Sequence, residues 1–552
     1  MSQPPVSQAN SKYLSIVAEN GEQFNPGQKI IFNLEENLGF IKKDSYLVFD
    51  VLNNSADNSR ACFGEAGANG LIKSLRIYSK KSGVLLEQLE NFNKWCSIEN
   101  QYLYDDREQL RIKEGVGKPT KAFQVKSDGV NVDNYFQVSD IENTLLSPVN
   151  LNQAANLQAE PAYESKRYCI PLRCGVFRYW DDEKLIPVMN MGGLRIELIL
   201  APAVEVLSRV AGSYKSVAKT GDTILNEPAE NGNFPADLIN VGVSIDNNAG
   251  ASKTITLTPI PADAPSGFDS AGAALNAQQP YMSALCVGNS ISIEGGAGGT
   301  QNVSITAMAL SGNKITITHG GAADTYAGNN GILKVLATTK LNYKITNTEM
   351  RLLQVAPSPE MAKVMGESIN YEFTSYDLFL DNIPTAALRH QIPINSVASK
   401  AKAVFSVIHD SRAADYQYNN GYYTGSNPTE NLINEVVYFI NNRLYPLSSY
   451  NPDTHGDRAL TLNELQKAFS AIGKNVLSLG NNEASNLNDY NQTFLLAREL
   501  ARNQFVFDLR DAEPEVRLGF SAVRPAVLNV NTFVFSKKVI MSQPGGQVIV
   551  SL

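Results

Sequence analysis

The sequence predicts an all-β fold with a few short helices, built from one β-rich unit that occurs twice in the chain. Apolar and polar residues alternate over many short stretches, which is typical of strands with one face in a core. The stretch LIKSLRIYSKKSGVLLEQLENFNKW, residues 71–95, has a counterpart in LINEVVYFINNRLYPLSSY, residues 432–450. Each begins as an alternating strand and turns over polar residues into a second apolar run. With 552 residues, the chain is too long for one ordinary core, so two or three domains are expected.

The similarity continues upstream of these stretches. SYLVFDVLNNS aligns with AKAVFSVIHDS, which places Phe49 opposite Phe405 at an offset of 405 − 49 = 356. Leu75 aligns with Val436 at a similar offset of 436 − 75 = 361. Before them, KIIFNL has a weaker counterpart in RHQIPI. Because the order of the stretches is kept, an internal duplication is favoured over chance similarity, and the paired residues are expected to superpose.

A helix is expected after each copy of the hairpin. In the first copy, the apolar residues on one helical face are Phe92, Trp95, Cys96, Tyr102 and Leu103. In the second copy, Thr461-Leu-Asn-Glu464 has the capping-box sequence, in which Thr461 and Glu464 satisfy free backbone amides reciprocally. The apolar stripe that follows consists of Leu462, Leu465, Phe469 and Ile472. Gly473 is expected to end this second helix.

Each copy is expected to close with a long alternating strand. GGLRIELIL places on one face Leu194, Ile196, Leu198 and Leu200. VLNVNTFVFS alternates Leu528, Val530 and Val534 with Asn529, Asn531, Phe533 and Phe535. Between the copies, Ser358, Pro359 and Gly366 predict a short capped helix, and we place the domain junction there. The predicted organisation is an N-terminal arm (1–24), a first unit (25–356) and a second unit (357–552).

The first unit carries an extra segment from about residue 213 to residue 340. Charged residues are sparse in it, and short strands such as SKTITLTPI and NKITITHG are separated by the turn sequences DNNAGA, GGAGG and SGN. We interpret this segment as a small β-domain inserted into a loop, with its chain entry and exit close together.

Charge and composition argue against several classes of protein. The net charge of −8 disfavours a surface that neutralises nucleic-acid phosphates, so no sequence-specific nucleic-acid binding is expected. The amino terminus has neither a basic segment nor an apolar run, so no secretory signal is expected. The sequence contains no run of about 18 apolar residues, so no membrane span is expected. Free thiols are expected at the scattered cysteines Cys62, Cys96, Cys169, Cys174 and Cys286.

Motifs that carry chemistry are not found in the sequence. EGGAGGT lies between two predicted strands, so a hairpin turn is favoured over a phosphate-binding loop. In NPDTHGD, the residues Asp453, His455 and Asp457 could bind a metal, but ordinary turn chemistry is favoured. His409-Asp410 has no nucleophile nearby in the sequence and is interpreted as structural. We therefore expect no catalytic residue, no cofactor and no metal site.

The repeated stretches resemble the double jelly-roll major capsid proteins of eukaryotic double-stranded DNA viruses. This family includes proteins of virophages, polinton-like viruses and nucleocytoplasmic large DNA viruses. LIKSLRIYSKKSGVLLEQLENFN resembles the family's strand–turn–Glu–aromatic–Asn run, and YCIPLRCGVFRYWDDEKLIPVMNMGGLRIELILAP resembles its IPL, LIP and GGLRIEL segment. LINEVVYFINNRLYPLSSY resembles the hairpin of the second barrel. The resemblance covers most of the chain apart from the insert, and it implies two tandem jelly-roll β-sandwiches.

The same resemblance implies a structural major capsid protein without enzymatic activity. Three copies would form a homotrimeric, pseudo-hexameric capsomer, because two similar barrels in each chain fill six similar positions. Such capsomers would tile an icosahedral shell around a double-stranded DNA genome. The implied partners are neighbouring capsomers, penton proteins and minor capsid or cement proteins. The chain would be made in the host cell without a secretory signal and would reside in the virion.

The inserted segment is expected to form a tower on the outer surface of the capsomer. Its lysines, Lys253, Lys314 and Lys334, are too few and too dispersed to neutralise the phosphates of a packaged genome. Two alternatives to the capsid interpretation stay open at this point. One is a viral spike, fibre or glycan-binding jelly-roll protein, and the other is a carbohydrate-active β-sandwich enzyme with paired carboxylates facing one cleft.

Overall fold

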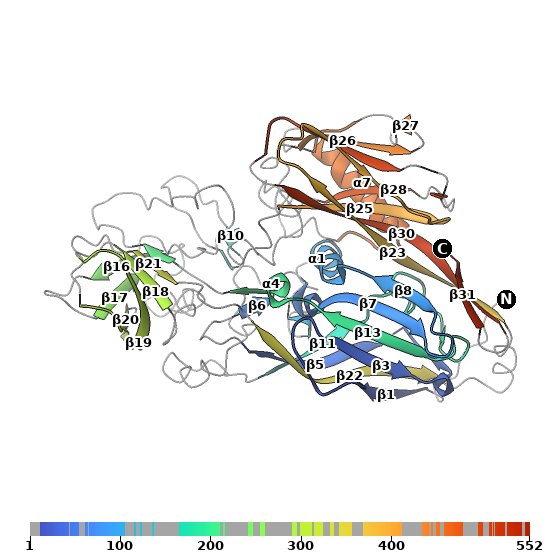
Figure 1. The fold of residues 1–552 in the computed structure, drawn as a ribbon, viewed down its shortest axis with the longest axis horizontal. Coiled ribbons are helices and arrows are strands. Elements are labelled where there is room, and N and C mark those ends of the chain that lie inside the picture. The colour runs from blue at the N-terminus through green and yellow to red at the C-terminus, as the bar shows by residue number, and fades with distance from the viewer. Residues whose placement is uncertain are drawn as a thin grey trace.

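Figure 1 shows the computed structural model as two β-sandwiches, one stacked on the other, with a smaller β-barrel beyond one end of them. The structure describes residues 11–43, 45–54, 61–63, 66–104, 115–117, 122–123, 135–136, 165–209, 213–215, 241–246, 254–259, 290–294, 298–311, 314–323, 332–335, 342–355, 368–410, 433–440, 443–444, 449–452, 457–477, 495–500, 507–510, 512, 514–524, 527–543 and 547–551.

The first sandwich consists of two antiparallel sheets. One has the order β1 (Ser11–Val17), β22 (Tyr343–Val355), β5 (Tyr46–Asn53) and β11 (Lys166–Pro171). Three short strands extend it: β2 (Gln23–Phe24), β4 (Phe40–Ile41) and β12 (Ile186–Pro187). The other has the order β3 (Lys29–Leu34), β13 (Leu194–Leu200), β7 (Ile72–Ser79) and β8 (Leu85–Leu89). Strands β3 and β13 bury alternate apolar residues, as the sequence predicted.

The second sandwich repeats this arrangement. One sheet has the order β23 (Ile369–Ile383), β30 (Leu528–Gln543), β25 (Ala401–Asp410) and β28 (Leu496–Glu499), and β31 (Gln547–Ser551) also pairs with β30. The other sheet has the order β24 (Arg389–Pro393), β29 (Glu515–Phe520), β26 (Ile433–Ile440) and β27 (Arg443–Leu444). Taken in chain order, the eight paired strands of each sandwich therefore occupy the same positions, from β1 and β23 to β22 and β30.

The helices also occupy equivalent places. Helix α1 (Phe92–Tyr102) lies between β8 and β11, and α7 (Arg458–Ala471) lies between β27 and β28. The hairpins that prompted the search for a repeat are β7–β8 and β26–β27, which take the same pairing positions. Leu75 pairs with Leu198, and Val436 pairs with Leu518 on the equivalent strand. The internal duplication is thus visible in the order of the strands.

Three sequence predictions are corrected by the sheets. Residues 11–24 are not a free arm, because β1 and β2 pair with β22. The strands β13 and β30 are not equivalent, because β13 takes the position of β29 while β22 takes that of β30. Phe49 and Phe405 do not face the same way. Phe49 packs inside its own sandwich, whereas Phe405 contacts Trp95 of the first sandwich at a ring distance of 5.1 Å.

Helix α7 begins differently from the prediction. Its N-terminal flanking residue is Asp457, and Thr461 lies inside the helix, where its hydroxyl donates to the carbonyl of Asp457. Glu464 does not close a capping box, because its carboxylate binds Arg498 and Lys467. The apolar stripe is confirmed: Leu465, Phe469 and Ile472 are buried, and Leu462 is partly buried. Gly473 follows the helix in the left-handed conformation, with φ of +74°.

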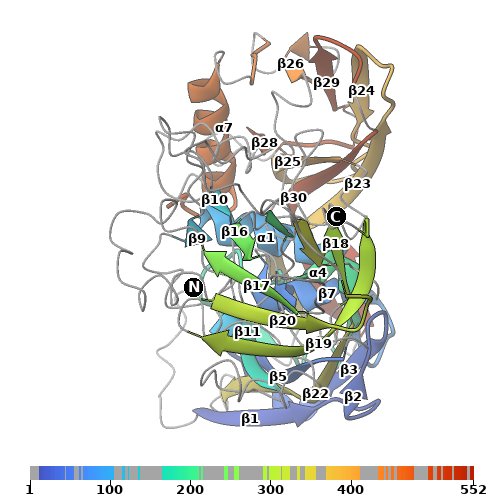
Figure 2. The same ribbon diagram turned by 90° about the vertical axis from the view of Figure 1, so that its left-hand side faces the viewer.

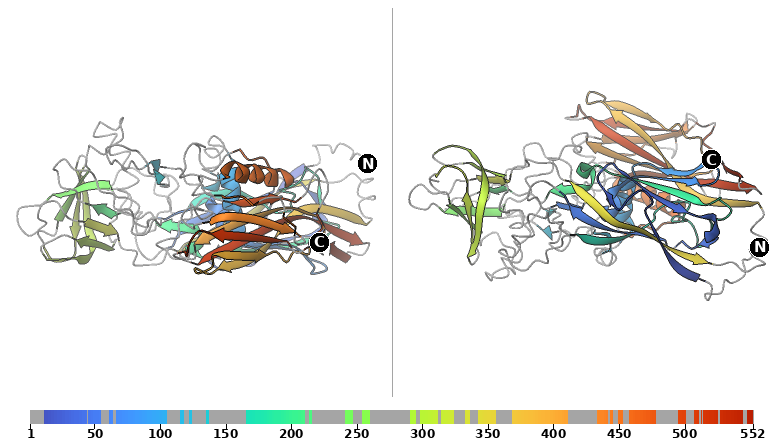
Figure 3. Two further views of the ribbon diagram at one scale, coloured as in Figure 1. Left: turned by 90° about the horizontal axis from the view of Figure 1, so that it is seen from above. Right: turned by 60° about the horizontal axis from the view of Figure 1, so that its bottom comes forward.

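The inserted segment forms a closed barrel. Its strands are β15 (Ser213–Lys215), β16 (Val241–Asp246), β17 (Thr254–Pro259), β20 (Lys314–His319), β19 (Gln301–Ser311), β18 (Ser290–Glu294) and β21 (Ile332–Val335). The first and last of these pair with each other, with Ser213 opposite Lys334, so the chain enters and leaves at adjacent points. The barrel interrupts the connection from β13 to β22. It stands apart from both sandwiches in Figures 1 and 3, and in Figure 2 it lies in front of them.

Smaller elements lie between the first sandwich and the barrel. The pairs are β6 (Ala61–Phe63) with β14 (Leu207–Arg209) and β9 (Ala122–Phe123) with β10 (Tyr135–Phe136), and helix α4 spans Ala203–Val206. The helix predicted around Ser358 and the junction between residues 356 and 357 lie outside the described residues. Among the helices of the described part, none has both the length and the hydropathy to cross a membrane.

Candidate functional site: the junction between the two sandwiches

The two sandwiches are joined by the outer face of the sheet β23–β30–β25–β28. Alternate residues of β25 point in opposite directions: Val404 and Ile408 belong to the core of the second sandwich, while Ala403, Phe405 and Val407 join the core of the first. Both faces of this sheet are therefore buried. The first sandwich covers it with α1, with β8 and with the connection 172–182, which joins β11 to β12.

Aromatic rings form the centre of the junction. Trp95 of α1 is fully buried, and its ring centroid lies 5.1 Å from that of Phe405, 5.3 Å from Phe533 and 4.6 Å from Phe535. Phe469 of α7 packs against Phe405 at 4.9 Å, so the two equivalent helices meet at the same cluster. Rings in tilted and edge-to-face geometry at these distances add to the stabilisation from burial alone. The junction is thus a hydrophobic core shared by both sandwiches.

The connection 172–182 follows β23 closely enough to require a glycine. A Cβ on Gly175 would lie 2.2 Å from the carbonyl oxygen of Thr374 and 2.6 Å from Phe373. On the same connection, Asp181 accepts hydrogen bonds from the backbone N–H of Thr374 (2.6 Å) and from its hydroxyl (2.8 Å). Tyr371 donates its hydroxyl to the carbonyl of Val176 at 2.7 Å. The bond from the N–H of Thr374 satisfies one backbone donor on the unpaired edge of β23.

A buried carboxylate ties three segments together. Glu87 on β8 accepts hydrogen bonds from the backbone N–H groups of Gly175 (2.8 Å) and Val176 (2.9 Å). It also accepts one from the hydroxyl of Ser375 on β23, at 2.6 Å. Burial raises the pKa of Glu87, although these hydrogen bonds act in the opposite direction. The carboxylate links β8 and the connection of the first sandwich to the edge of the second.

A second buried polar group anchors α1 beneath the junction. Arg173 and Glu99 form an ion pair at 3.2 Å, with exposed side-chain fractions of 1% and 0%. Arg173 also donates to the amide oxygen of Asn100 at 2.6 Å, and Trp180 donates its ring N–H to Glu99 at 2.8 Å. A buried pair of this kind is costly to break because it leaves an uncompensated charge. It therefore fixes α1 against the connection 172–182.

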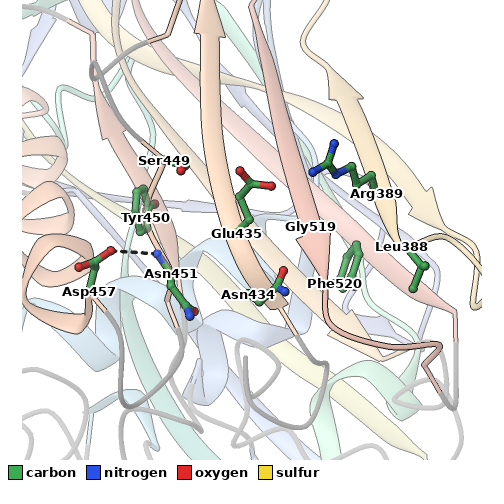
Figure 4. A pocket seen from close by; sticks show the side chains of 10 residues that line it. All are labelled: Leu388, Arg389, Asn434, Glu435, Ser449, Tyr450, Asn451, Asp457, Gly519 and Phe520. Atoms are coloured by element: carbon green, nitrogen blue, oxygen red, sulfur yellow. Dashed lines mark hydrogen bonds between the residues drawn. The ribbon is translucent and has the colours of Figure 1, made fainter.

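The second sandwich carries a polar cleft of about 560 Å³ on the outer face of its other sheet. Arg389, Gly519 and Glu435 lie opposite one another on β24, β29 and β26, and a Cβ on Gly519 would lie 2.9 Å from that of Glu435, so the glycine leaves room for this side chain. Figure 4 shows the carboxylates of Glu435 and Asp457 in this cleft, on either side of Tyr450. Asp457 accepts a hydrogen bond from the backbone N–H of Asn451 at 3.1 Å, as a turn residue does.

The residues singled out for chemistry do not come together. Asp453 and His455 lie outside the described residues, and Asp457 supports the turn before α7. His409 is paired within the sheet opposite Asn529. Within the described ranges, no cluster of three or more metal-ligating side chains occurs. The stretch EGGAGGT connects β18 to its antiparallel partner β19, as expected for a hairpin turn. Cys96, Cys169 and Cys174 are free thiols, and only Cys169 among these three is exposed.

The contacts that build the junction were not predicted from the sequence. Glu87, Glu99 and Arg173 resemble ordinary surface residues in a sequence, and no local pattern signals that they are buried. One weak signal existed: GVFRYW places three large rings within a short loop. Only the pairing of distant strands brings these segments together.

Two consecutive eight-stranded sandwiches with the same strand order define a double jelly roll. No protein-family model matches the chain, and no curated protein matches its sequence. Among solved structures, the Faustovirus major capsid protein has a TM-score of 0.51 at 8% identity, covering 98% of this chain and 92% of that one. It therefore has the same fold as this chain.

Two further solved structures align with the chain over its full length. PBCV-1 VP54, fitted into a reconstruction of the virophage Sputnik, has a TM-score of 0.48 at 9% identity and covers 100% of this chain and 98% of that one. The mavirus major capsid protein has a TM-score of 0.36 at 10% identity, covering 100% of this chain and 92% of that chain. All three of these proteins are capsid proteins of viruses.

Proposed function

We propose that this chain is the major capsid protein of a double-stranded DNA virus. Three copies form a pseudo-hexameric capsomer, and capsomers tile an icosahedral shell. The observation that carries this proposal is the pair of equivalent sandwiches held together by the buried junction. A subunit that must fill two of six similar positions needs both the repeat and the rigid connection.

The junction supports a structural task rather than a reaction. Its buried groups are aromatic rings, a carboxylate satisfied by backbone amides and an internal ion pair, which hold the two sandwiches together. We assign no catalytic residue, cofactor or metal to the chain. Glu435 and Asp457 share a cleft, but Asp457 is engaged in a turn, so the carbohydrate-active alternative gains no specific support.

The proposal includes the partners and the location of the protein. Neighbouring capsomers surround each trimer in the shell, and penton and minor capsid or cement proteins fill the positions that a trimer cannot. The protein is located in the virion. We place the inserted barrel on the outer surface as a tower; its projection from one end of the sandwiches in Figure 1 and the pairing of its entry and exit strands support this placement.

Light scattering coupled to size-exclusion chromatography tests the assembly. We expect a trimer at micromolar concentration, since obligate interfaces bury more than about 2,000 Å². Electron microscopy of the trimer should show a hexagonal outline with a projection for each chain. A stable monomer at all accessible concentrations would contradict the proposal.

Removal of the inserted barrel tests its assignment as a tower. A variant in which a Gly-Ser bridge replaces residues 213–335 should form the same trimer and lose the outward projection, because Ser213 and Lys334 are adjacent. The full-length chain is the control. Failure of the shortened chain to fold, or a projection on the face toward the genome, would refute this part of the proposal.

A further inference from the structure

A β-bulge shapes the polar cleft of the second sandwich. The pairing of β26 with β29 shifts between Ile433 and Glu435, which pair with the consecutive residues Phe520 and Gly519, so Asn434 is the extra residue of the bulge. Successive side chains of a regular strand point to opposite faces, whereas a bulge can turn two neighbours to the same side. Asn434 and Glu435 accordingly both line the cleft (Figure 4).

The two side chains of the bulge converge over Gly519. A Cβ on this glycine would lie 3.1 Å from Oδ1 of Asn434 and 3.1 Å from Oε2 of Glu435. The oxygens therefore come close to the space that any other residue at this position would fill with its own side chain. A glycine inside a strand is typical of a site where a ligand or another backbone approaches closely. The bulge and the glycine together set two hydrogen-bonding groups side by side.

Charges of both signs face the cleft without neutralising each other. Arg389 and Glu435 flank Gly519 on the neighbouring strands, yet within the described part of the chain neither side chain forms an ion pair. Arg517, two residues before Gly519 and on the same face of β29, pairs with Glu515 instead. The guanidinium of Arg389 and the carboxylate of Glu435 therefore keep their hydrogen-bonding capacity for a ligand.

Further polar groups lie on the other side of Glu435 from Arg389, as Figure 4 shows for Asn451 and Asp457. Asp457 uses its Oδ2 to accept the backbone N–H of Asn451 at 3.1 Å, and the residue is exposed. The apolar contribution comes from Leu388, which is 53% exposed. The volume of about 560 Å³ falls within the range of small-molecule sites, and a few convergent polar groups are typical of such sites.

We propose that this cleft binds a neutral sugar residue of a glycan. A hydroxyl group both donates and accepts hydrogen bonds, so neighbouring hydroxyls of a sugar ring can bind a carboxylate, an amide and a guanidinium at once. A cationic ligand would face Arg389, and an anionic one would face Glu435 and Asp457. Walls of mixed charge therefore favour a ligand without net charge. The contact is binding without hydrolysis, because Asp457 stays engaged in its turn.

This proposal goes beyond the proposed function, and only the accessibility of the cleft in a shell rests on that function. Strand β29 ends at Phe520, and its connection to β30 corresponds to the connection from β13 to β22 that carries the inserted barrel. The cleft therefore lies at the end of its sandwich that is equivalent to the barrel-bearing end of the first. With the barrel as an outer tower, this end faces the outside of the shell, where cell-surface glycans are encountered.

Saturation-transfer NMR of the full-length protein tests the binding. The probes are the methyl glycosides of glucose, galactose and mannose. We expect at least one of them to bind with a Kd of about 1–10 mM, as suits a single sugar in an open cleft. The uronate of the same ring adds a carboxylate, and the 2-amino sugar adds an ammonium. Each should bind at least about fivefold more weakly than its neutral parent, because it meets a like charge.

Substitutions in the bulge locate the site. Asn434→Ala and Glu435→Ala each remove a hydrogen-bonding group and should raise the Kd of the bound glycoside at least about tenfold. Gln391→Ala is the matched control, because Gln391 is exposed on the same face of β24 as Arg389 but does not line the cleft. Its Kd should stay within about twofold of wild type. Asn434 is exposed, so its variant should keep the wild-type melting temperature within about 2 °C.

Three results would overturn the proposal. One is the absence of binding of all three neutral glycosides to folded wild-type protein up to about 50 mM. Another is equal Kd values for the bulge variants and Gln391→Ala, and the third is tighter binding of a uronate or an amino sugar than of its neutral parent. Light scattering measures the proposed function separately. A trimer that binds no sugar contradicts only the assignment of the cleft, whereas a monomer that binds sugar contradicts only the capsid proposal.

Discussion

Two equivalent sheets of this molecule present opposite surfaces. Across β23–β30–β25–β28, the residues in register are Leu378, Phe533, Phe405 and Ala497, and they lie under the first sandwich. Across β1–β22–β5–β11, the corresponding ladder is Val17, Glu349, Val48 and Cys169. One sheet is rich in aromatic residues and covered. The outer side of the other sheet, which we call the open face, is mixed in polarity: Val17 at its edge is 70% exposed, whereas Val48 in its middle is buried. The same fold has therefore been adapted to a permanent contact within the chain and to an accessible surface.

The ion pairs follow the same division. The pair beneath the covered junction, Arg173 with Glu99, is fully buried, whereas Arg167 on the open face pairs with Asp50 and remains 61% exposed. Asp50 also accepts a hydrogen bond from Asn347 at 2.7 Å, so the open face carries a small polar network. Burial makes the first pair essential to the junction, while solvent weakens the second. The comparison predicts unequal responses to equivalent substitutions.

Removal of the central ring should have the largest effect. Trp95→Ala leaves a cavity among Phe405, Phe533 and Phe535 and is expected to lower the free energy of unfolding by about 3–5 kcal/mol. Urea denaturation followed by fluorescence measures this loss, with Leu477→Ala as a control at a side chain that is 56% exposed. A loss below about 1 kcal/mol would remove the energetic contrast between the two faces.

The matched arginines give the next comparison. Arg173→Met leaves Glu99 buried without its cation and should cost about 3 kcal/mol or more of unfolding free energy. Arg167→Met removes a solvent-exposed partner from Asp50 and should cost less than about 1 kcal/mol. Equal losses in the two variants, measured by the same denaturation, would show that burial does not distinguish the pairs.

The strands were predictable from the sequence because alternation is a local signal, as β3 and β13 show. The direction in which Phe405 faces was not predictable. Both sides of β25 are buried, and alternation alone cannot choose between two cores. The capping box failed for a related reason: Glu464 gains more from the buried Arg498, which lies 34 residues away, than from the helix terminus. Contacts between distant segments decided each of these cases.

A smaller loss of stability is expected from a substitution at Gly175, where the two sandwiches approach each other closely. Gly175→Ala would place a methyl group 2.2 Å from the carbonyl of Thr374, so the connection must shift away from β23. Overpacking of this kind is expected to cost about 1–3 kcal/mol of unfolding free energy. Gly115→Ala is the control, because its nearest neighbouring atom would be 3.7 Å from the added Cβ. Comparable stability of the two variants in thermal denaturation would argue against tight contact at this point.

The smallest effect concerns the pH dependence of the open face. Hydrogen bonding to Arg167 lowers the pKa of Asp50 below its ordinary value of 3.8, although partial burial opposes this. A carboxyl group with a lowered pKa in the folded chain contributes stability above its unfolded pKa and loses it as the pH falls through the folded one. Wild-type protein should therefore lose up to about 1 kcal/mol more than Asp50→Asn between about pH 6 and pH 2.5. Denaturant titrations of both proteins across this range measure the difference. Because Arg167 is exposed, added salt should reduce this difference in stability. Parallel pH profiles of the two proteins would mean that the Asp50 network adds nothing to the stability of the folded chain.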